Sequence, residues 1–243
     1  MRRFMTCAGL DGKTDRLSQL TELIRQRQPE VVLFAGGIGC ADCVDTSQAG
    51  FSPKQLERYT AFQEWARSID VPIALIPGTH EVPLGEFYQW AANMETDLPH
   101  VHVVHGTPWR ERDTVVGGMG GVIGETGHGE SPRLEVSRAE AEYYLRQVLR
   151  DDAPIHVLLF HQPPNGRLGG DAGNAIVGEL IDSLHPKLAV VAGPTAQRGI
   201  EQVAHTTVVN PGRLSDGSLG YVDVGKPFDE RVEWLDLAAG AGV

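Results

Sequence analysis

Cysteine is scarce in this sequence, with three residues in 243, and three is an odd number. So few cysteines cannot form the dense disulfide framework of a small secreted domain. In a reducing compartment they are expected to be free thiols, metal ligands or buried apolar residues. The sequence also lacks a run of about 18 apolar residues, the length that a membrane-spanning helix needs. No membrane partner is therefore expected.

Basic residues are also under-represented, because the chain has 21 Lys and Arg but 32 Asp and Glu, which gives a net charge of −11. Such a surface repels phosphate backbones, so no nucleic-acid partner is expected. A small phosphorylated molecule or another anion remains a candidate partner where metal ions or backbone amides neutralise it locally. The N-terminal stretch "MRRFMTCAG" has too short an apolar run for a secretory signal, which predicts a cytoplasmic protein.

Apolar strand patterns alternate with helical patterns along the chain. Hydrophobic residues make up 41% and charged residues 22%, as in ordinary globular proteins. Buried strands are predicted at 3–7, 31–37, 73–78, 101–106, 155–164, 187–193, 205–212, 220–224 and 231–237, with antiparallel strands within 107–124. Helices are predicted at 13–28, 52–70, 83–93, 137–151 and 173–184. This order indicates one layered α/β domain over residues 1–243.

Small or chemically active residues follow the predicted strands. They are Gly9 and Asp11, then Gly36 and Gly37, Thr79 and His80, His161, and Gly193. In open α/β sheets, ligands bind in the crevice beyond the carboxyl ends of the strands. His80 and His161 are therefore expected to converge there.

These junctions resemble the motifs of the calcineurin-like metallophosphoesterases. The corresponding stretches read "GLDG", "AGG", "PGTHE", "FHQPP" and "AGPTA", and "VVNPGRLSDGSLGYVDV" is similar to the closing strand turn of the family. The resemblance covers nearly the whole chain and implies a four-layer α/β/β/α sandwich. It also implies a site in which two divalent cations bind phosphate and activate a water molecule.

Most ligand positions of that two-metal site are replaced here. By the resemblance, the seven positions fall on Gly9, Asp11, Gly37, Thr79, His161, Pro194 and Ala196. Glycine, proline and alanine offer no side-chain donor, so no binuclear centre is expected. The chain resembles a small bacterial branch of the family with such replacements. His80 matches the family histidine that donates a proton or hydrogen bond to phosphate, which makes it the candidate catalytic residue.

The C-x-x-C pair of Cys40 and Cys43 has no counterpart in the family pattern. The spacing is typical of zinc sites and of thiol redox pairs, although a single pair is a weak signal. Together with His161 and Asp11, these cysteines form the candidate metal ligands. A single divalent ion, zinc or manganese, is the cofactor that such a set could hold.

Three functions remain open from the sequence. The favoured one is a binding or regulatory module without two-metal phosphohydrolase activity. Its candidate ligand-binding residues are Gly9, Gly37, Thr79, Arg198 and Arg213, with backbone amides exposed by the glycines. The second is a phosphoesterase with one metal ion and His80 as the acid. The third is thiol redox chemistry or zinc binding at Cys40 and Cys43. Whether the protein is an enzyme is not determined by the sequence.

Overall fold

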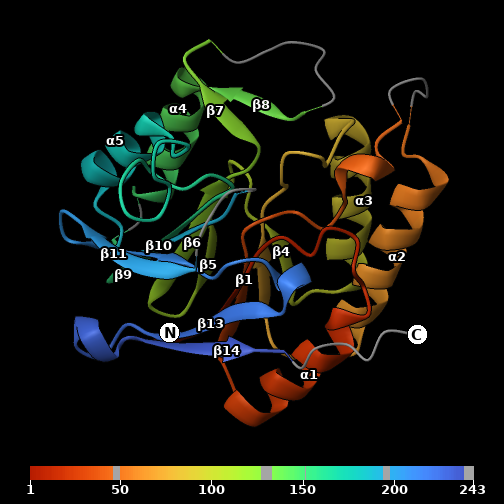
Figure 1. Cartoon of the computed structure of the whole chain (residues 1–243), viewed down its shortest axis with the longest axis horizontal. Coiled ribbons are helices and arrows are strands. Elements are labelled where there is room, and N and C mark those ends of the chain that lie inside the picture. Colours follow the sequence, from red (N-terminus) through yellow and green to blue (C-terminus); the bar gives the residue numbers. More distant parts are fainter. Residues whose placement is uncertain (46–49, 127–132, 151, 194–197, 238–243) are drawn as a thin grey trace.

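A computed structural model describes residues 1–45, 50–126, 133–150, 152–193 and 198–237 (Figure 1). One mixed sheet has six strands in the order β14-β13-β1-β2-β3-β4. Their bounds are β1 Arg3–Cys7, β2 Val31–Phe34, β3 Ile73–Leu75, β4 Val101–Val103, β13 Ser218–Asp223 and β14 Val232–Asp236. Strands β1 to β4 are parallel, and β13 and β14 add an antiparallel edge.

The second sheet also has six strands, in the order β11-β12-β10-β9-β6-β5. Their bounds are β5 Trp109–Glu111, β6 Thr114–Met119, β9 Ile155–Phe160, β10 Leu188–Val191, β11 Gly199–Val203 and β12 Thr206–Asn210. The inner strands β6, β9, β10 and β12 are parallel. A separate pair, β7 (Val122–Gly124) with β8 (Glu135–Ser137), is parallel as well.

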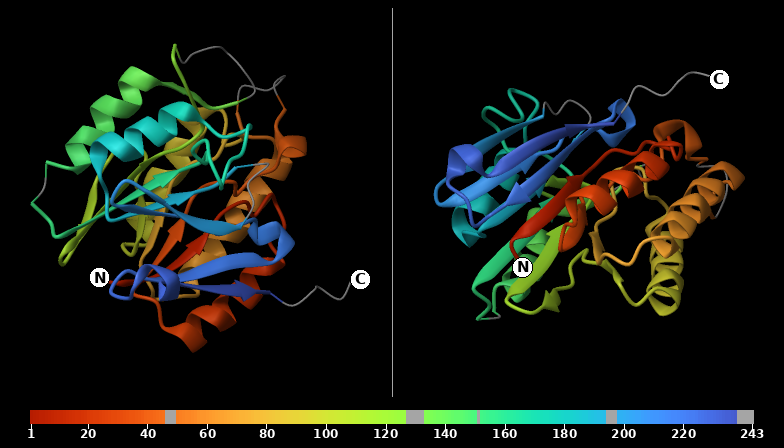
Figure 2. Two further views of the ribbon diagram at one scale, coloured as in Figure 1. Left: turned by 60° about the vertical axis from the view of Figure 1, so that its left-hand side comes forward. Right: turned by 90° about the horizontal axis from the view of Figure 1, so that it is seen from below.

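Helices cover the outer face of each sheet. In Figures 1 and 2, the red to yellow helices lie on one side of the molecule and the green and cyan helices on the other. Their bounds are α1 Arg16–Arg27, α2 Pro53–Arg67, α3 Leu84–Asp97, α4 Arg138–Val148 and α5 Ala175–Leu184. Both predicted helix starts at serine are confirmed, since Ser52 and Ser137 each form a capping box with the residue three positions later.

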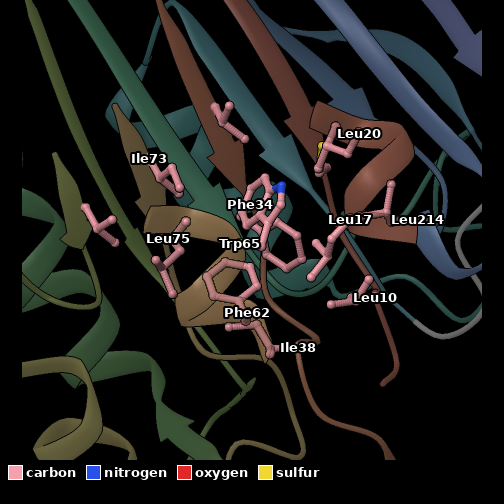
Figure 3. Close-up of a cluster of buried hydrophobic side chains, with 14 of the residues drawn as sticks. Leu10, Leu17, Leu20, Phe34, Ile38, Phe62, Trp65, Ile73, Leu75 and Leu214 are labelled. Atoms are coloured by element: carbon pink, nitrogen blue, oxygen red, sulfur yellow. The ribbon is translucent and has the colours of Figure 1, made fainter. Parts of the chain in front are cut away.

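Three apolar clusters hold these four layers together. One lies between the sheets and includes Phe4, Leu33 and Val157. A second packs α1, α2 and α3 against the first sheet, and Figure 3 shows its Phe34, Phe62 and Trp65 side chains in contact. The third packs α4 and α5 against the second sheet. The predicted four-layer α/β/β/α sandwich is therefore confirmed.

The structure differs from the sequence prediction in several elements: strands β8 and β11 were not predicted, and β7 pairs parallel with β8 although antiparallel strands were predicted within 107–124. Helix α3 runs to Asp97, four residues beyond the predicted 83–93, because Phe87, Ala91 and Met94 continue its buried face. Three 3-10 turns were not predicted: η1 Ala41–Cys43, η2 Leu214–Asp216 and η3 Phe228–Glu230. No helix among the described residues is long and apolar enough to cross a membrane.

Candidate functional site

A cavity of about 650 Å³ lies beyond the carboxyl ends of β1, β2, β3, β9, β10 and β12. Because both sheets contribute parallel strands, their loops meet at this one edge of the sandwich. The polar and charged side chains that line the cavity are those of Asp11, Asp42, Thr79, His80, Arg133, His161, Gln162 and Arg213, together with Cys40. The sequence-based expectation that His80 and His161 converge is confirmed.

The carboxylate of Asp11 is bound by an arginine and a serine from the loop after β12. Its Oδ2 accepts hydrogen bonds from Nε and Nη2 of Arg213, at 3.0 and 2.6 Å, and from Oγ of Ser215 at 2.9 Å. The ion pair raises the pKa of the Arg213 guanidinium. Asp11 was predicted as a metal ligand, but here it neutralises a cation of the chain itself.

His161 is buried at the end of β9, with only 8% of its surface exposed. Its Nδ1 lies 2.7 Å from the carbonyl oxygen of Ala35. Because a carbonyl oxygen can only accept, Nδ1 carries the hydrogen, and in the neutral ring Nε2 keeps a lone pair. His161 can therefore accept one further hydrogen bond or offer one nitrogen to a metal ion. Metal ligation by His161 stays a prediction.

His80 is half-buried, and its neighbours shift its proton affinity in opposite directions. Burial lowers the pKa of His80 and is the largest cause; Glu81 opposes it, while Arg133 and His161 add to the lowering. The neutral imidazole is therefore favoured at neutral pH. In this state His80 can donate a hydrogen bond from one nitrogen and accept at the other.

Glu81 is fully buried next to the cavity. Its Oε1 accepts a hydrogen bond of 2.9 Å from the backbone amide of Gly39, which ties the loop after β3 to the loop after β2. Its Oε2 has no hydrogen-bond partner among the described residues, and neither has the hydroxyl of Tyr59. Burial, and secondarily the charge of Glu81, raises the pKa of Tyr59. The sequence shows that Glu81 follows His80, but only the folded structure shows that Glu81 is buried.

The glycines at two predicted ligand positions allow close backbone packing and do not open space for a ligand. Gly37 has a φ of +82°, and a Cβ built on it would lie 3.0 Å from Cα of Gly9. The amide of Gly9 donates to the carbonyl of Gly36 at 2.9 Å, and the amide of Asp11 donates to Gly37. The expectation that the Gly9 amide would cradle an anion is therefore wrong, because that donor is already used.

The remaining predicted ligand-binding residues divide between the cavity and the surface. Gly9, Thr79 and Arg213 line the cavity, whereas Gly37 is not part of its lining. Arg198 also lies outside it, since its guanidinium pairs with Asp236 and stacks on the ring of Trp234 at 5.6 Å. The sequence did not single out Arg133 or Gln162. The position of Gln162 directly after the predicted site residue His161 is the sequence feature that could have indicated it as a cavity residue.

The four predicted metal ligands do not form one donor set. Cys40 and Cys43 are joined by a disulfide, and disulfide sulfurs do not act as thiolate ligands. Among the described residues, no group of three or more His, Cys, Asp and Glu side chains could hold a metal ion. Pro194 and Ala196, at two further ligand positions of the implied centre, lie outside the described residues.

Comparisons with known proteins agree with the fold. The family model described as metallophosphoesterase, calcineurin superfamily, matches residues 1–231. One solved crystal structure shares 24% identity at a TM-score of 0.85, covering 98% of this chain and 99% of its own. The structure of TT1561 of Thermus thermophilus shares 25% identity at a TM-score of 0.83, covering 97% and 99%. A novel phosphatase from Mycoplasma pneumoniae shares 11% identity at a TM-score of 0.50, covering 97% and 94%, which is a likeness of fold. No curated protein sequence matches the chain.

Proposed function

The chain belongs to the calcineurin superfamily of metallophosphoesterases, and we propose that it binds a small phosphorylated anion without two-metal phosphohydrolysis. The observation that carries this proposal is the Asp11–Arg213–Ser215 cluster at the cavity wall. The superfamily fold places a binuclear cation site at this edge of the sheets. In this chain the same edge holds a guanidinium supplied by the protein.

The chemistry of the donors supports the loss of the two-metal centre. Gly9 and Gly37 carry no side-chain donor, and the only described carboxylate of the implied ligand set, Asp11, is already paired with Arg213. Hard divalent cations need several oxygen ligands, and a guanidinium in their place repels them. The residues present therefore do not fit a binuclear centre, and no step of the proposed function passes through one.

Several donors face the cavity and are suited to an anion. Arg213 uses Nε and Nη2 on Asp11, with Oδ2 of Asp216 at 3.9 Å from Nε, and Nη1 forms no hydrogen bond or ion pair among the described residues. Gln162 accepts from the amides of Ile123 and Asn174 through Oε1, which leaves its own amide hydrogens for a ligand. Arg133 and His80 add a guanidinium and an imidazole. Charge-assisted hydrogen bonds from such groups are the usual means of holding phosphate.

A second candidate function is a phosphoesterase that works with one zinc or manganese ion. The orientation of His161 favours it, because the contact of Nδ1 with Ala35 leaves Nε2 as the free donor atom. Water, Thr79 and substrate oxygens would have to complete the coordination. In this version His80 would exchange a proton or hydrogen bond with the phosphate ester.

Calorimetric titration with inorganic phosphate tests the main proposal. We expect Arg213→Gln to weaken binding at least about tenfold, equivalent to about 1.4 kcal/mol. Arg198→Gln is the matched control, because Arg198 is a surface arginine outside the cavity lining, and its affinity should stay unchanged. Equal affinities in both variants would contradict the proposal.

Metal analysis and hydrolysis assays separate the two candidates. Two tightly held transition metals per purified chain would overturn the main proposal. Hydrolysis of p-nitrophenyl phosphate or its diester with added manganese or zinc, lost in His80→Ala, would favour the one-metal enzyme. Background rates that are equal for wild type and His80→Ala would end that second candidate.

A further inference from the structure

The two linked cysteines differ in their access to the cavity. Cys40 is half-buried and lines the cavity wall, whereas Cys43 is only 2% exposed beneath it. The disulfide joins them across η1, immediately after the loop that follows β2. In thiol–disulfide exchange the attacking thiolate must reach one of the two sulfurs. Here the accessible sulfur is Sγ of Cys40.

An arginine from α2 lies in the neighbourhood of this accessible sulfur. A Cβ built on Gly12 would lie 3.3 Å from Sγ of Cys40 and 3.5 Å from Nε of Arg58, so both groups flank Gly12. Nε of Arg58 is buried and has no hydrogen-bond partner among the described residues. A buried donor without an acceptor is costly, and a negative charge at Cys40 would lower that cost through its attraction to the guanidinium. A neighbouring positive charge also favours the thiolate over the thiol.

We propose that Cys40 and Cys43 form a reversible dithiol–disulfide pair that exchanges with glutathione or a dithiol protein. The incoming thiolate attacks Sγ of Cys40, which forms a mixed disulfide and releases Cys43 as a thiolate that takes up a proton. A second thiol of the reductant then attacks the mixed disulfide. It releases Cys40 as a thiolate near the guanidinium of Arg58. Two electrons pass from the reductant, which becomes the disulfide, to the cysteine pair.

Hydrogen bonds outside the disulfide hold this loop in place. The carbonyl of Cys43 accepts from Oγ of Ser52 at 2.6 Å, and the carbonyl of Ile38 accepts from the amide of Gly12 at 3.1 Å. Glu81 binds the amide of Gly39 in addition. Reduction therefore removes one covalent link from a segment that stays anchored, which makes the exchange reversible in the folded protein. This inference does not depend on anion binding in the cavity.

Cys7 provides an internal control for the experiment. It is fully buried, and burial raises the pKa of its thiol, so it should resist alkylation in the folded chain. The folded protein is equilibrated with mixtures of reduced and oxidised glutathione and then alkylated with N-ethylmaleimide. Mass spectrometry of the digest locates each label. We expect Cys40 to become labelled as the glutathione mixture becomes more reducing, with Cys43 labelled at least about tenfold more slowly because it is buried, while Cys7 stays unlabelled.

Single-cysteine variants test the assigned roles. In Cys43→Ser, Cys40 should form a mixed disulfide with glutathione; in Cys40→Ser, Cys43 should react at least about tenfold more slowly. Arg58→Gln in the Cys43→Ser background should slow alkylation of Cys40 about threefold or more. Arg67→Gln is the matched control, because Arg67 lies on the same helix and pairs with Asp97 at the surface.

Three outcomes would overturn the inference. They are a cysteine pair that never exchanges while Cys7 stays protected, equal reactivity of Cys40 and Cys43, and equal rates for the Arg58 and Arg67 variants. Labelling of Cys7 in a variant would reveal unfolding. In that case partial reduction of the wild-type protein decides the matter, since glutathione should be trapped on Cys40 and not on Cys43.

Discussion

The interior of the sandwich and the surroundings of its cavity differ in how completely their buried polar atoms are hydrogen-bonded. Between the sheets, the buried side chains are apolar residues such as Phe4, Leu33 and Val157. Behind the loops that follow β1 and β2, outside the cavity lining, buried polar atoms of Glu81, Tyr59 and Arg58 have no hydrogen-bond partner among the described residues. Satisfied interiors stabilise a fold, whereas unsatisfied polar atoms at a crevice are typical of sites that meet a ligand. The packing that stabilises the fold and the groups available for chemistry therefore lie in different parts of the molecule.

The largest expected effect is on the interior. Phe62→Ala removes a fully buried ring that contacts Phe34 at 5.4 Å and Trp65 at 5.1 Å between ring centres. We expect it to lower the free energy of unfolding by about 3–5 kcal/mol. Its dissociation constant for phosphate should stay within about twofold of the wild type, because distant sites act independently. Urea denaturation and calorimetry measure the two quantities. A large loss of phosphate binding in the folded variant would contradict the expectation that the interior and the cavity act independently.

His105 is buried just after β4, and its contribution to stability depends on pH. Burial lowers the pKa of His105 to about 4, and its Nδ1 accepts from the amide of Gly120 at 2.8 Å. The unfolded chain takes up this proton near pH 6.5, before the folded chain does, so stability is lost as pH falls from about 6.5 to about 4. The loss should be about 3 kcal/mol, at about 1.4 kcal/mol per pKa unit.

Urea denaturation at several pH values, with His105→Asn as the comparison, checks this expectation. Asparagine keeps an acceptor near Gly120 but does not titrate, so its stability should depend less on pH. Equal pH dependence in the variant and the wild type would show that other groups are responsible.

Gly37→Asp tests whether a carboxylate at this predicted ligand position can restore metal binding. The left-handed backbone at Gly37 and the 3.0 Å approach of its Cβ to Gly9 should cost about 2 kcal/mol of stability. No manganese binding should be gained. Gly85→Asp is the control, because a Cβ there meets no atom within 4 Å. A stable Gly37→Asp variant that binds manganese tightly would contradict the description of a closed site.

The smallest expected effect concerns protonation of His80. Because burial lowers the pKa of His80, the cationic ring should accumulate only below its ordinary value of about 6.5. Sulfate, which stays a dianion throughout, should therefore bind about threefold more tightly near pH 5.5 than near pH 7.5, a difference below about 1 kcal/mol. His80→Gln should remove most of this increase. An unchanged increase in the variant would assign it to another group.

The layered fold could be predicted because its signals are local and repeated. The apolar runs at β1, β2 and β9, the capping boxes at Ser52 and Ser137, and the order of strand-end motifs each depend on neighbours in sequence. The convergence of His80 and His161 followed from parallel strands alone. The bond between Asp11 and Arg213 could not be predicted, because it joins residues 202 positions apart through two side chains.

The sequence by itself determined which donors are missing, since no fold can give Gly9 or Gly37 a carboxylate. It also determined a layered α/β fold, because periodic apolar patterns specify which faces must be buried; the number of layers came from the resemblance of the strand-end motifs to the family. Only the tertiary structure decided what stands in place of the donors: a guanidinium held by Asp11, a closed contact between Gly9 and Gly37, and a cysteine pair with one accessible sulfur. These features depend on distances between side chains from remote segments, and such distances exist only once the two sheets have packed together.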